Sequence, residues 1–512
     1  MSEIPENTAP STAGMTTKVV KGSLWTLGGQ VLPMMVSFFA TPFVIRFLGS
    51  EKYGVLILVG LIPTYFSFAD FGMGIASTKF GSEAYGQGNG EKEAAIVRTA
   101  AFIAFCSSMA VALPIFLFSS QIIGLFNVPP ELHTVASISL KITAVALVFG
   151  IIGQVVNTPM LARLRMDMNT ATSAVPKILM AATTPFVLFL GGGIVEAVCV
   201  AFGTAALMLT ANIYFSGRLL PQLYGWTINR EYFRPLLKYG GAWLIGSIAG
   251  ILLVNLEKIF LTRFVSVRAL AYYSVAFTFS SIATMFSAAM IQSLIPAFSQ
   301  LTTKEKRSEF DALFSRSIRL NLILTFPGLM FLFVIARPFF TIWAGPEFGA
   351  ESTLPFYILL LGLIFNFPAY IPFTTIAAVG RTDVFAKLYW IEIFLYSAVA
   401  YMLIRHFGIV GAAAAWSLRV TADAIVMIWL SKHIAGVSYK FLYGSWSMVL
   451  GVAALLPPVF VAAFYDNLSP VLIGLLPVCS AVYAILIWKW FIDSDERLWI
   501  KGRAQTLLNF IR

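Results

Sequence analysis

Long apolar segments follow one another along almost the whole sequence, separated by short polar loops. An α-helix needs about 20 predominantly apolar residues to cross the hydrocarbon core of a bilayer. About fourteen segments meet this requirement, at 22–47, 54–78, 99–126, 136–161, 174–191, 195–217, 239–262, 270–298, 320–343, 353–378, 385–404, 409–430, 443–464 and 469–490. They lack the alternation expected of a membrane β-strand. The sequence therefore predicts an all-α polytopic membrane protein.

Composition excludes the main soluble alternatives. Of the 512 residues, 58% are hydrophobic and 12% are charged, whereas a soluble domain has about 45–50% apolar and about 25% charged residues. The formal net charge of +11 comes from Lys and Arg spread over many loops, so no nucleic-acid groove is predicted. The three cysteines and three histidines form no sequence cluster typical of a metal site, and no cofactor is predicted.

The distribution of Lys and Arg predicts the orientation. Basic residues collect in the cytoplasmic loops of multi-pass proteins. With the N-terminus inside, most of the 35 Lys and Arg residues fall in cytoplasmic loops or helix ends. We therefore expect both termini to be cytoplasmic, with a tail over 1–21 and an amphipathic segment over 491–512 on the inner leaflet.

Three short motifs recur at a spacing of about 217 residues, each at an equivalent place in the predicted topology. The matched pairs are Trp25-x-x-Gly28 with Trp243-x-x-Gly246, Arg46-Phe47 with Arg263-Phe264, and Arg165-x-Asp167 with Arg381-x-Asp383. Such a repeat predicts two parallel six-helix bundles, 22–217 and 239–430, around a central cavity. The cytoplasmic linker is then 218–238, and 431–490 supplies two extra helices.

This arrangement is typical of a transporter rather than an enzyme. A membrane polymerase or ligase would need a catalytic platform, but the predicted outer loops are short, and the Walker A, HExxH and GxSxG motifs are absent. A scaffold without transport activity is the remaining alternative. It would leave ionisable residues at membrane depth unexplained, because such residues are costly there.

Acidic residues within the predicted spans are candidates for ion coupling. Asp70, Glu257 and Asp423 are the candidate coupling acids. Asp423 is also spaced to pair with Arg419 on one helix face, so a buried structural ion pair is the competing interpretation. A further acid, Glu392, lies in the eleventh span.

Basic residues in the spans and at their outer ends are candidates for the substrate cavity. They are Arg46, Lys141, Lys258, Arg263 and Arg419. Arg and Lys pair well with phosphate, so a diphosphate-linked substrate would suit such a set. The competing interpretation is that those near span ends reach the headgroups and contact no substrate.

Several of these motifs resemble a known family. The stretches Gly22-Ser23-Leu24-Trp25-x-x-Gly28, Pro42 with Arg46-Phe47-Leu48-Gly49-Ser50-Glu51-Lys52-Tyr53-Gly54, Asp70-Phe71-Gly72-Met73-Gly74 and Gly380-Arg381 carry the likeness. They are similar to motifs of polysaccharide flippases. These are the O-antigen (Wzx-type) and exopolysaccharide exporters of the multidrug/oligosaccharidyl-lipid/polysaccharide superfamily.

The resemblance implies a function and partners. It implies alternating access between two bundles that moves an undecaprenyl-diphosphate-linked oligosaccharide across the bacterial cytoplasmic membrane. The implied partners are this lipid-linked oligosaccharide, membrane lipids, and a polysaccharide polymerase with chain-length proteins. Two alternatives of the same superfamily stay open, a multidrug cation antiporter and a lipid II flippase.

Overall fold

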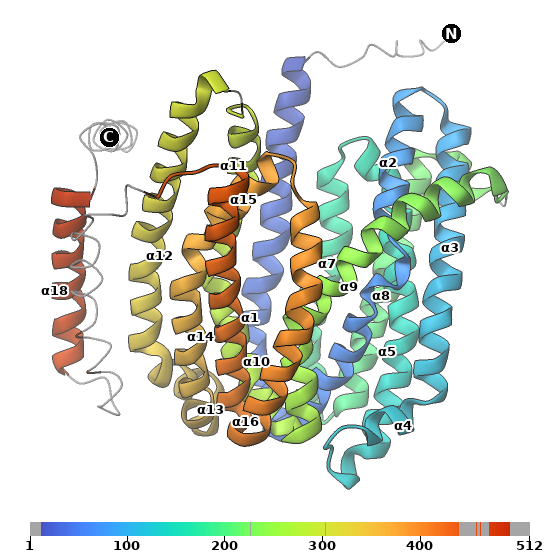
Figure 1. Cartoon of the computed structure of the whole chain (residues 1–512). Helices are drawn as coiled ribbons and strands as arrows, with labels where there is room; N and C mark the ends of the chain where they lie inside the picture. Colours follow the sequence, from blue (N-terminus) through green and yellow to red (C-terminus); the bar gives the residue numbers. More distant parts are fainter. Residues whose placement is uncertain are drawn as a thin grey trace, which may run out of the picture. The chain divides into compact units, whose positions relative to one another are not determined.

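A computed structural model describes residues 12–225, 227–302, 304–439, 457, 461 and 470–491, and these are helical apart from their connections (Figure 1). Eight helical stretches of the described chain are long and apolar enough to cross a membrane. This confirms the prediction of an all-helical, multi-pass membrane protein. The predicted helix at 443–464 falls almost wholly outside the described residues, as do 1–11 and 492–512 of the predicted tails.

The chain divides into two compact units, unit 1 (Met1–Ala271) and unit 2 (Tyr272–Arg512). The helices that begin in unit 1 are α1 (Thr12–Tyr65), η1 (Ser67–Asp70), α2 (Met73–Gly86), α3 (Gly90–Leu117), α4 (Ser119–Gly124), α5 (Pro130–Val156), α6 (Thr158–Ala162), α7 (Met166–Phe189), α8 (Ile194–Leu219), η2 (Pro221–Tyr224), η3 (Arg230–Tyr232), α9 (Phe233–Phe264) and α10 (Val267–Ala283).

Unit 2 continues from α10. Its further elements are α11 (Met285–Ser299), η4 (Lys304–Lys306), α12 (Arg307–Ala344), α13 (Pro346–Glu351), α14 (Thr353–Asn366), η5 (Phe367–Ala369), α15 (Tyr370–Ala378), α16 (Asp383–Ile434), α18 (Pro470–Leu486) and a π-helical turn, η7 (Ile487–Phe491). Helix α18 is joined to α12 by a 3.2 Å hydrogen bond from the Tyr483 hydroxyl to the Ile323 carbonyl.

Single glycines turn the chain within the two longest helical stretches. Gly49 in α1 has φ 76°, and Gly408 in α16 has φ 55°. Positive φ is open to glycine at little steric cost, so each position ends one helix and begins the next. The two turns coincide with the loops predicted between the first and second spans and between the eleventh and twelfth.

Some helices extend beyond the predicted spans. The loop predicted over 79–98 is helical except at 87–89, because α2 and α3 continue through polar residues. The Asn89 side chain accepts a 2.9 Å hydrogen bond from the Lys92 amide and caps α3. Hydropathy marks the part of a helix that suits lipid, whereas capping decides where the helix ends.

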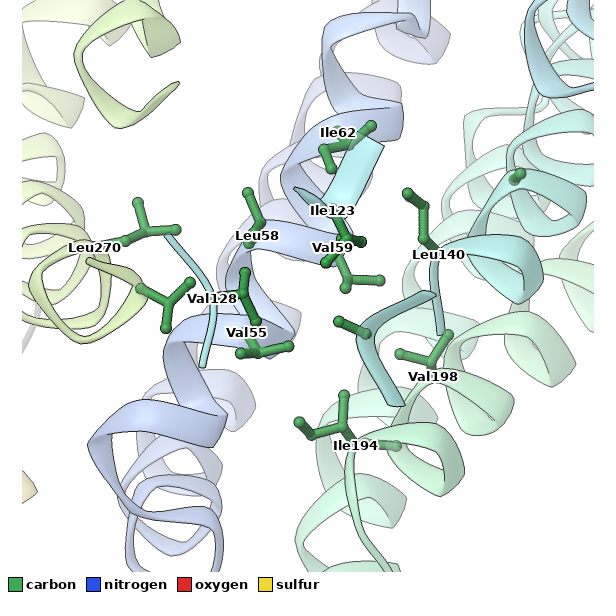
Figure 2. Packing of buried hydrophobic residues seen from close by; sticks show 14 of the residues in the cluster. Val55, Leu58, Val59, Ile62, Ile123, Val128, Leu140, Ile194, Val198 and Leu270 are labelled. Carbon is green, nitrogen blue, oxygen red and sulfur yellow. The ribbon is translucent and has the colours of Figure 1, made fainter. Parts of the chain in front are cut away.

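The core of unit 1 forms around the second half of α1. Val55, Leu58, Val59 and Ile62 pack there among apolar side chains of α4, α5, α8 and the start of α10 (Figure 2). Gly54 permits this packing, because a Cβ at that position would lie 1.9 Å from the Val267 carbonyl oxygen.

Unit 2 has an aromatic core. Phe279 makes edge contacts with Phe340 and Trp343, at centroid distances of 5.5 and 5.0 Å. Helices α14 and α16 approach closely at Gly362, where a Cβ would lie 2.7 Å from the Ser417 hydroxyl. Large apolar side chains are meanwhile exposed along the helices, including Phe394 at 72%. A lipid environment suits such a surface.

Candidate functional site

A cavity of about 950 Å³ opens within unit 1, between η1 and α2 on one wall, the end of α5 with α6 on another, and α9 on a third. Ligand pockets commonly measure about 300–1,000 Å³. Its polar side chains are Ser67, Asp70, Thr78, Lys79, Gln154, Asn157 and Ser247. The only predicted site residue among its lining is Asp70. This space is called the unit 1 cavity below.

Asp70 is held in place by a tight turn between η1 and α2. The next two residues, Phe71 and Gly72, have φ of 52° and 70°. The Asp70 carboxylate accepts hydrogen bonds from the amides of Gly72, at 2.9 Å, and Gly74, at 3.2 Å. Gly72 also lies against Gly240 of α9, where a Cβ would come within 2.6 Å of a carbonyl oxygen. The Asp-x-Gly motif therefore fixes the Asp70 carboxylate on the cavity wall through hydrogen bonds from backbone amides.

The facing wall carries two amides at the end of α5. Gln154 is exposed, and Asn157 follows it by about one helical turn on the same side. The Asn157 amide nitrogen donates to Asn169 Oδ1 at 3.0 Å. Its Oδ1 is buried and has no hydrogen-bond partner among the described residues. A buried acceptor without a partner is costly, so a ligand hydroxyl that reached it would form a favourable hydrogen bond.

Among the described residues of the cavity lining, Lys79 is the one with a formal positive charge. Its ammonium lies 4.4 Å from the ring centre of Tyr239 and 5.0 Å from that of Phe80. These are cation–π contacts, which hold the charge without neutralising it. Sequence reasoning missed Lys79 because it fell at the start of a predicted loop.

Glu257 and Lys258 lie on α9, outside the lining of the unit 1 cavity. Glu257 is fully buried, and the Lys258 ammonium donates to Asn255 Oδ1 at 2.8 Å. The Tyr65 hydroxyl donates to the Asn255 carbonyl oxygen. These contacts connect α9 to α1 inside unit 1.

The other predicted basic residues of unit 1 have different surroundings. Arg46 is exposed, and Lys141 is half-buried with its ammonium 5.7 Å from the Phe116 ring centre. Arg263 is exposed and donates to the Leu125 carbonyl oxygen at 2.6 Å. Lys141 and Arg263 thus have different partners, the Phe116 ring and the Leu125 carbonyl oxygen.

Helix α9 belongs to unit 1 by its contacts. Beside the Gly72–Gly240 contact and the Arg263 bond, the Asn127 amide donates to the Thr262 carbonyl oxygen at 3.0 Å. The sequence repeat, in contrast, places α9 at the start of the second half. The compact units thus divide at 271, later in the chain than the predicted linker.

Unit 2 contains a second charged group, the ionic cluster of Glu392, Arg419 and Asp423, all on α16. A guanidinium nitrogen of Arg419 lies 3.7 Å from a carboxylate oxygen of Glu392. Asp423 lies close enough to interact with both. Arg419 Nε and Asp423 Oδ1 have no hydrogen-bond partner among the described residues.

The structure corrects the expected pairing in this cluster. The ion pair found joins Arg419 to Glu392, and not to Asp423 on the same helix face. The reason is the turn at Gly408, which folds α16 back on itself. Residues at similar distances before and after such a turn face each other, and this places Glu392 near Asp423. The rule that residues four apart on one helix can pair does not predict a contact between residues on either side of a turn.

The repeated Arg-x-Asp motifs have the same local structure. In both motifs Arg Nε donates to the Asp Oδ1 two residues later at 3.0 Å, from Arg165 to Asp167 and from Arg381 to Asp383. Each motif precedes or opens a long helix, α7 or α16. The hydrogen bond to Asp167 raises the pKa of Arg165. The two motifs therefore share a local geometry, and the repeat of the two halves stays a prediction.

Known proteins resemble this chain in sequence and in fold. It is 21% identical over 419 residues to a candidate O-antigen transporter of Shigella flexneri, covering 82% of this chain and 99% of that protein. The lipid II flippase MurJ in its inward closed conformation superposes with a TM-score of 0.68 at 14% identity, covering 91% of this chain and 98% of that one.

An inward-facing multidrug resistance transporter of the MATE family, in the MOP superfamily, gives a TM-score of 0.65 at 11% identity over 80% of this chain and 98% of that one. At these identities the two structures establish the fold alone. The model of the family described as polysaccharide biosynthesis protein matches residues 19–302, more than half of the sequence. The resemblance predicted from the motifs is thereby confirmed, and the chain belongs to the polysaccharide biosynthesis protein family.

Proposed function

We propose that this protein is a flippase that moves an undecaprenyl-diphosphate-linked oligosaccharide across the cytoplasmic membrane for O-antigen or exopolysaccharide export. The observation that carries this proposal is the unit 1 cavity, a polar space inside an otherwise apolar helical unit. Membership of the polysaccharide biosynthesis family and similarity to a candidate O-antigen transporter support it.

The proposed mechanism is alternating access. In it, fourteen helices form two six-helix bundles and an extra C-terminal pair, with both termini in the cytoplasm. The lipid-linked headgroup enters from the inner leaflet, and the bundles then rearrange to release it outside. A polysaccharide polymerase and chain-length proteins would take up the product.

Charged residues are given two roles in this proposal, headgroup contact and ion coupling, and Arg419 is proposed for both. Asp70 contacts the headgroup because it lines the unit 1 cavity. Asp423 and Glu392 couple transport to a cation, since two facing carboxyl groups beside one guanidinium can exchange a proton or a metal ion. Glu257 remains a further proposed coupling acid.

The basic residues predicted from the sequence remain proposed contacts to the diphosphate. They are Arg46, Lys141, Lys258, Arg263 and Arg419. Joint replacement of Lys141, Lys258 and Arg419 by Met tests this assignment. Intact export by the triple variant would remove these three residues from the substrate path.

A multidrug cation antiporter is the second candidate, favoured by the acid in the unit 1 cavity and by the MATE-like fold. Lys79 in the same lining opposes it, because a cationic drug would meet a like charge there. A lipid II flippase is a third candidate and shares the proposed mechanism.

The deciding experiment is a clean deletion of the gene. We expect lipid-linked oligosaccharide to accumulate on the cytoplasmic face and the wild-type gene to reverse this accumulation. Unchanged lipid-linked pools together with new sensitivity to cationic dyes would refute the flippase and favour the antiporter.

A further inference from the structure

The unit 1 cavity offers hydrogen-bonding groups that the protein does not use up. Each Asp70 carboxylate oxygen accepts one backbone amide, although a carboxylate has about four acceptor sites. Asn157 Oδ1 is unpartnered, and the Gln154 amide is exposed. Thr78 Oγ donates to the Gly74 carbonyl oxygen at 2.8 Å, which leaves its lone pairs free to accept. Acceptors and amide donors of this kind match a ligand that carries several hydroxyl groups.

The charge of the lining restricts which ligand this can be. Asp70 and Lys79 are the charged side chains among the described residues that line it, and their formal charges cancel. An acidic sugar would meet the Asp70 carboxylate, and an organic cation would meet the Lys79 ammonium. Both would be desolvated next to a like charge, which is costly at low dielectric. An uncharged polyhydroxyl group avoids both penalties.

Lys79 remains able to bind a phosphate. It has no ion pair with a carboxylate among the described residues, and its ammonium lies over the rings of Tyr239 and Phe80. A Lys ammonium binds phosphate as a point charge, without demanding a fixed geometry. A neutral sugar in the cavity would therefore place its phosphate beside a cation that is already positioned.

We propose that the unit 1 cavity binds an uncharged sugar through Asp70, Gln154 and Asn157 while Lys79 pairs with the phosphate attached to that sugar. The inference rests on the proposed flippase function and adds the chemical class of the headgroup. The shared ligand chemistry is a neutral sugar phosphate, and it has two sources, a lipid-linked sugar and a soluble nucleotide sugar.

Binding to the purified full-length protein in nanodiscs tests this proposal. The probes are farnesyl diphosphate, farnesyl-diphosphate-linked N-acetylglucosamine, farnesyl-diphosphate-linked glucuronic acid and UDP-N-acetylglucosamine. We expect the neutral lipid-linked sugar to bind about tenfold more tightly than farnesyl diphosphate, because its hydroxyl groups form hydrogen bonds with Asp70, Gln154 and Asn157 that farnesyl diphosphate cannot form. The acidic sugar should lose this advantage. Tighter binding of the UDP-sugar than of the lipid-linked sugar would identify the soluble source.

Variants separate the sugar contacts from the phosphate contact. Gln154→Leu and Asn157→Leu should remove the sugar-dependent gain and leave the affinity for farnesyl diphosphate unchanged. Lys79→Met should weaken all four diphosphate probes, and Lys79→Arg should restore them. Gln87→Leu and Lys92→Met are matched controls, because the Lys92 ammonium donates to the exposed Gln87 side chain at 3.0 Å outside the cavity lining. Gln154→Met and Asn157→Ala, which add no charge, serve where a leucine variant does not fold.

The result that overturns the inference is an unchanged preference for the neutral sugar in the Gln154 and Asn157 variants. If the wild-type gene still restores export in the deletion strain, the flippase function stands while this sugar site is wrong. If the wild-type gene restores no export, the proposed function itself fails, whatever the cavity binds.

Discussion

The two units differ in how completely their buried ion pairs are hydrogen-bonded. In unit 1, Arg163 donates to both carboxylate oxygens of Glu93, at 2.6 and 3.1 Å, and Glu93 is fully buried. In the ionic cluster of unit 2, Arg419 reaches Glu392 at 3.7 Å and leaves its Nε without a hydrogen bond among the described residues. A fully hydrogen-bonded pair holds helices together. A loosely paired cluster with spare acceptors can change partners, which is what ion coupling requires.

The same contrast separates the unit 1 cavity from the unit 2 cluster. The cavity spreads one acid, one base and neutral amides over its wall, and Asp70 is anchored by backbone amides. The cluster brings three charged side chains together, with Arg419 and Glu392 only 15% and 11% exposed. We interpret unit 1 as the place of headgroup recognition and unit 2 as the place of ion exchange. The predictions below test this division.

The largest effect on stability is expected from Arg163→Met. It would leave the fully buried Glu93 without its partner, and breaking a buried pair in this way costs about 3–5 kcal/mol. Thermal unfolding of the purified protein measures the loss. The control is Arg165→Met, which removes a neighbouring but exposed ion pair. Equal melting temperatures for the two variants would contradict the structural role of Glu93–Arg163.

Arg419→Met should affect transport more than stability. The two remaining carboxyl groups can share one proton, so the fold tolerates the change, whereas a cluster without its guanidinium no longer releases that proton. We expect normal amounts of protein in the membrane and a loss of export in the deletion strain. Arg405→Met is the control, because this exposed residue of the same helix contacts only Tyr401 among the described residues. Export at the wild-type level would remove Arg419 from the coupling site.

Gly72→Ala should have an intermediate effect that is confined to unit 1. A left-handed conformation costs a residue with a Cβ roughly 1–2 kcal/mol, and that Cβ would also lie 2.6 Å from the Gly240 carbonyl oxygen. The Asp70 turn and the contact with α9 would both loosen. Thermal unfolding and binding of the sugar probes measure the two consequences. Gly241→Ala is the control, since a Cβ there meets nothing within 4 Å, and equal behaviour of both variants would contradict the prediction.

The sequence predicted the helices and singled out Asp70, which lies in the cavity lining, for identifiable physical reasons. Apolar runs of membrane length indicate helices, because backbone N–H and C=O groups in lipid have no water to bind and must form hydrogen bonds within the segment. Asp70 was recognisable because an acid at membrane depth is costly. Gln154 and Asn157 carry no charge and gave no such signal. The Glu392–Arg419 contact depends on the turn at Gly408, which joins residues far apart in the sequence. Distances across a helical hairpin come from tertiary packing and not from local pattern.

The smallest effect on stability and export is expected from the Arg-x-Asp motifs, which have the same local structure in the two units. Asp167→Asn removes the exposed ion pair with Arg165, and Asp383→Asn removes the exposed pairs with Arg381 and Lys387. The Nε–Oδ1 distance within each motif is 3.0 Å. Exposed pairs contribute little because water and salt screen them, so neither change should move the melting temperature measurably at physiological salt. Export should also stay at the wild-type level for both variants. If only one of the two variants lost export, its motif would have a function that the other lacks. The two motifs would then share a local structure without sharing a function. The functional difference between the units would include these motifs at the starts of α7 and α16.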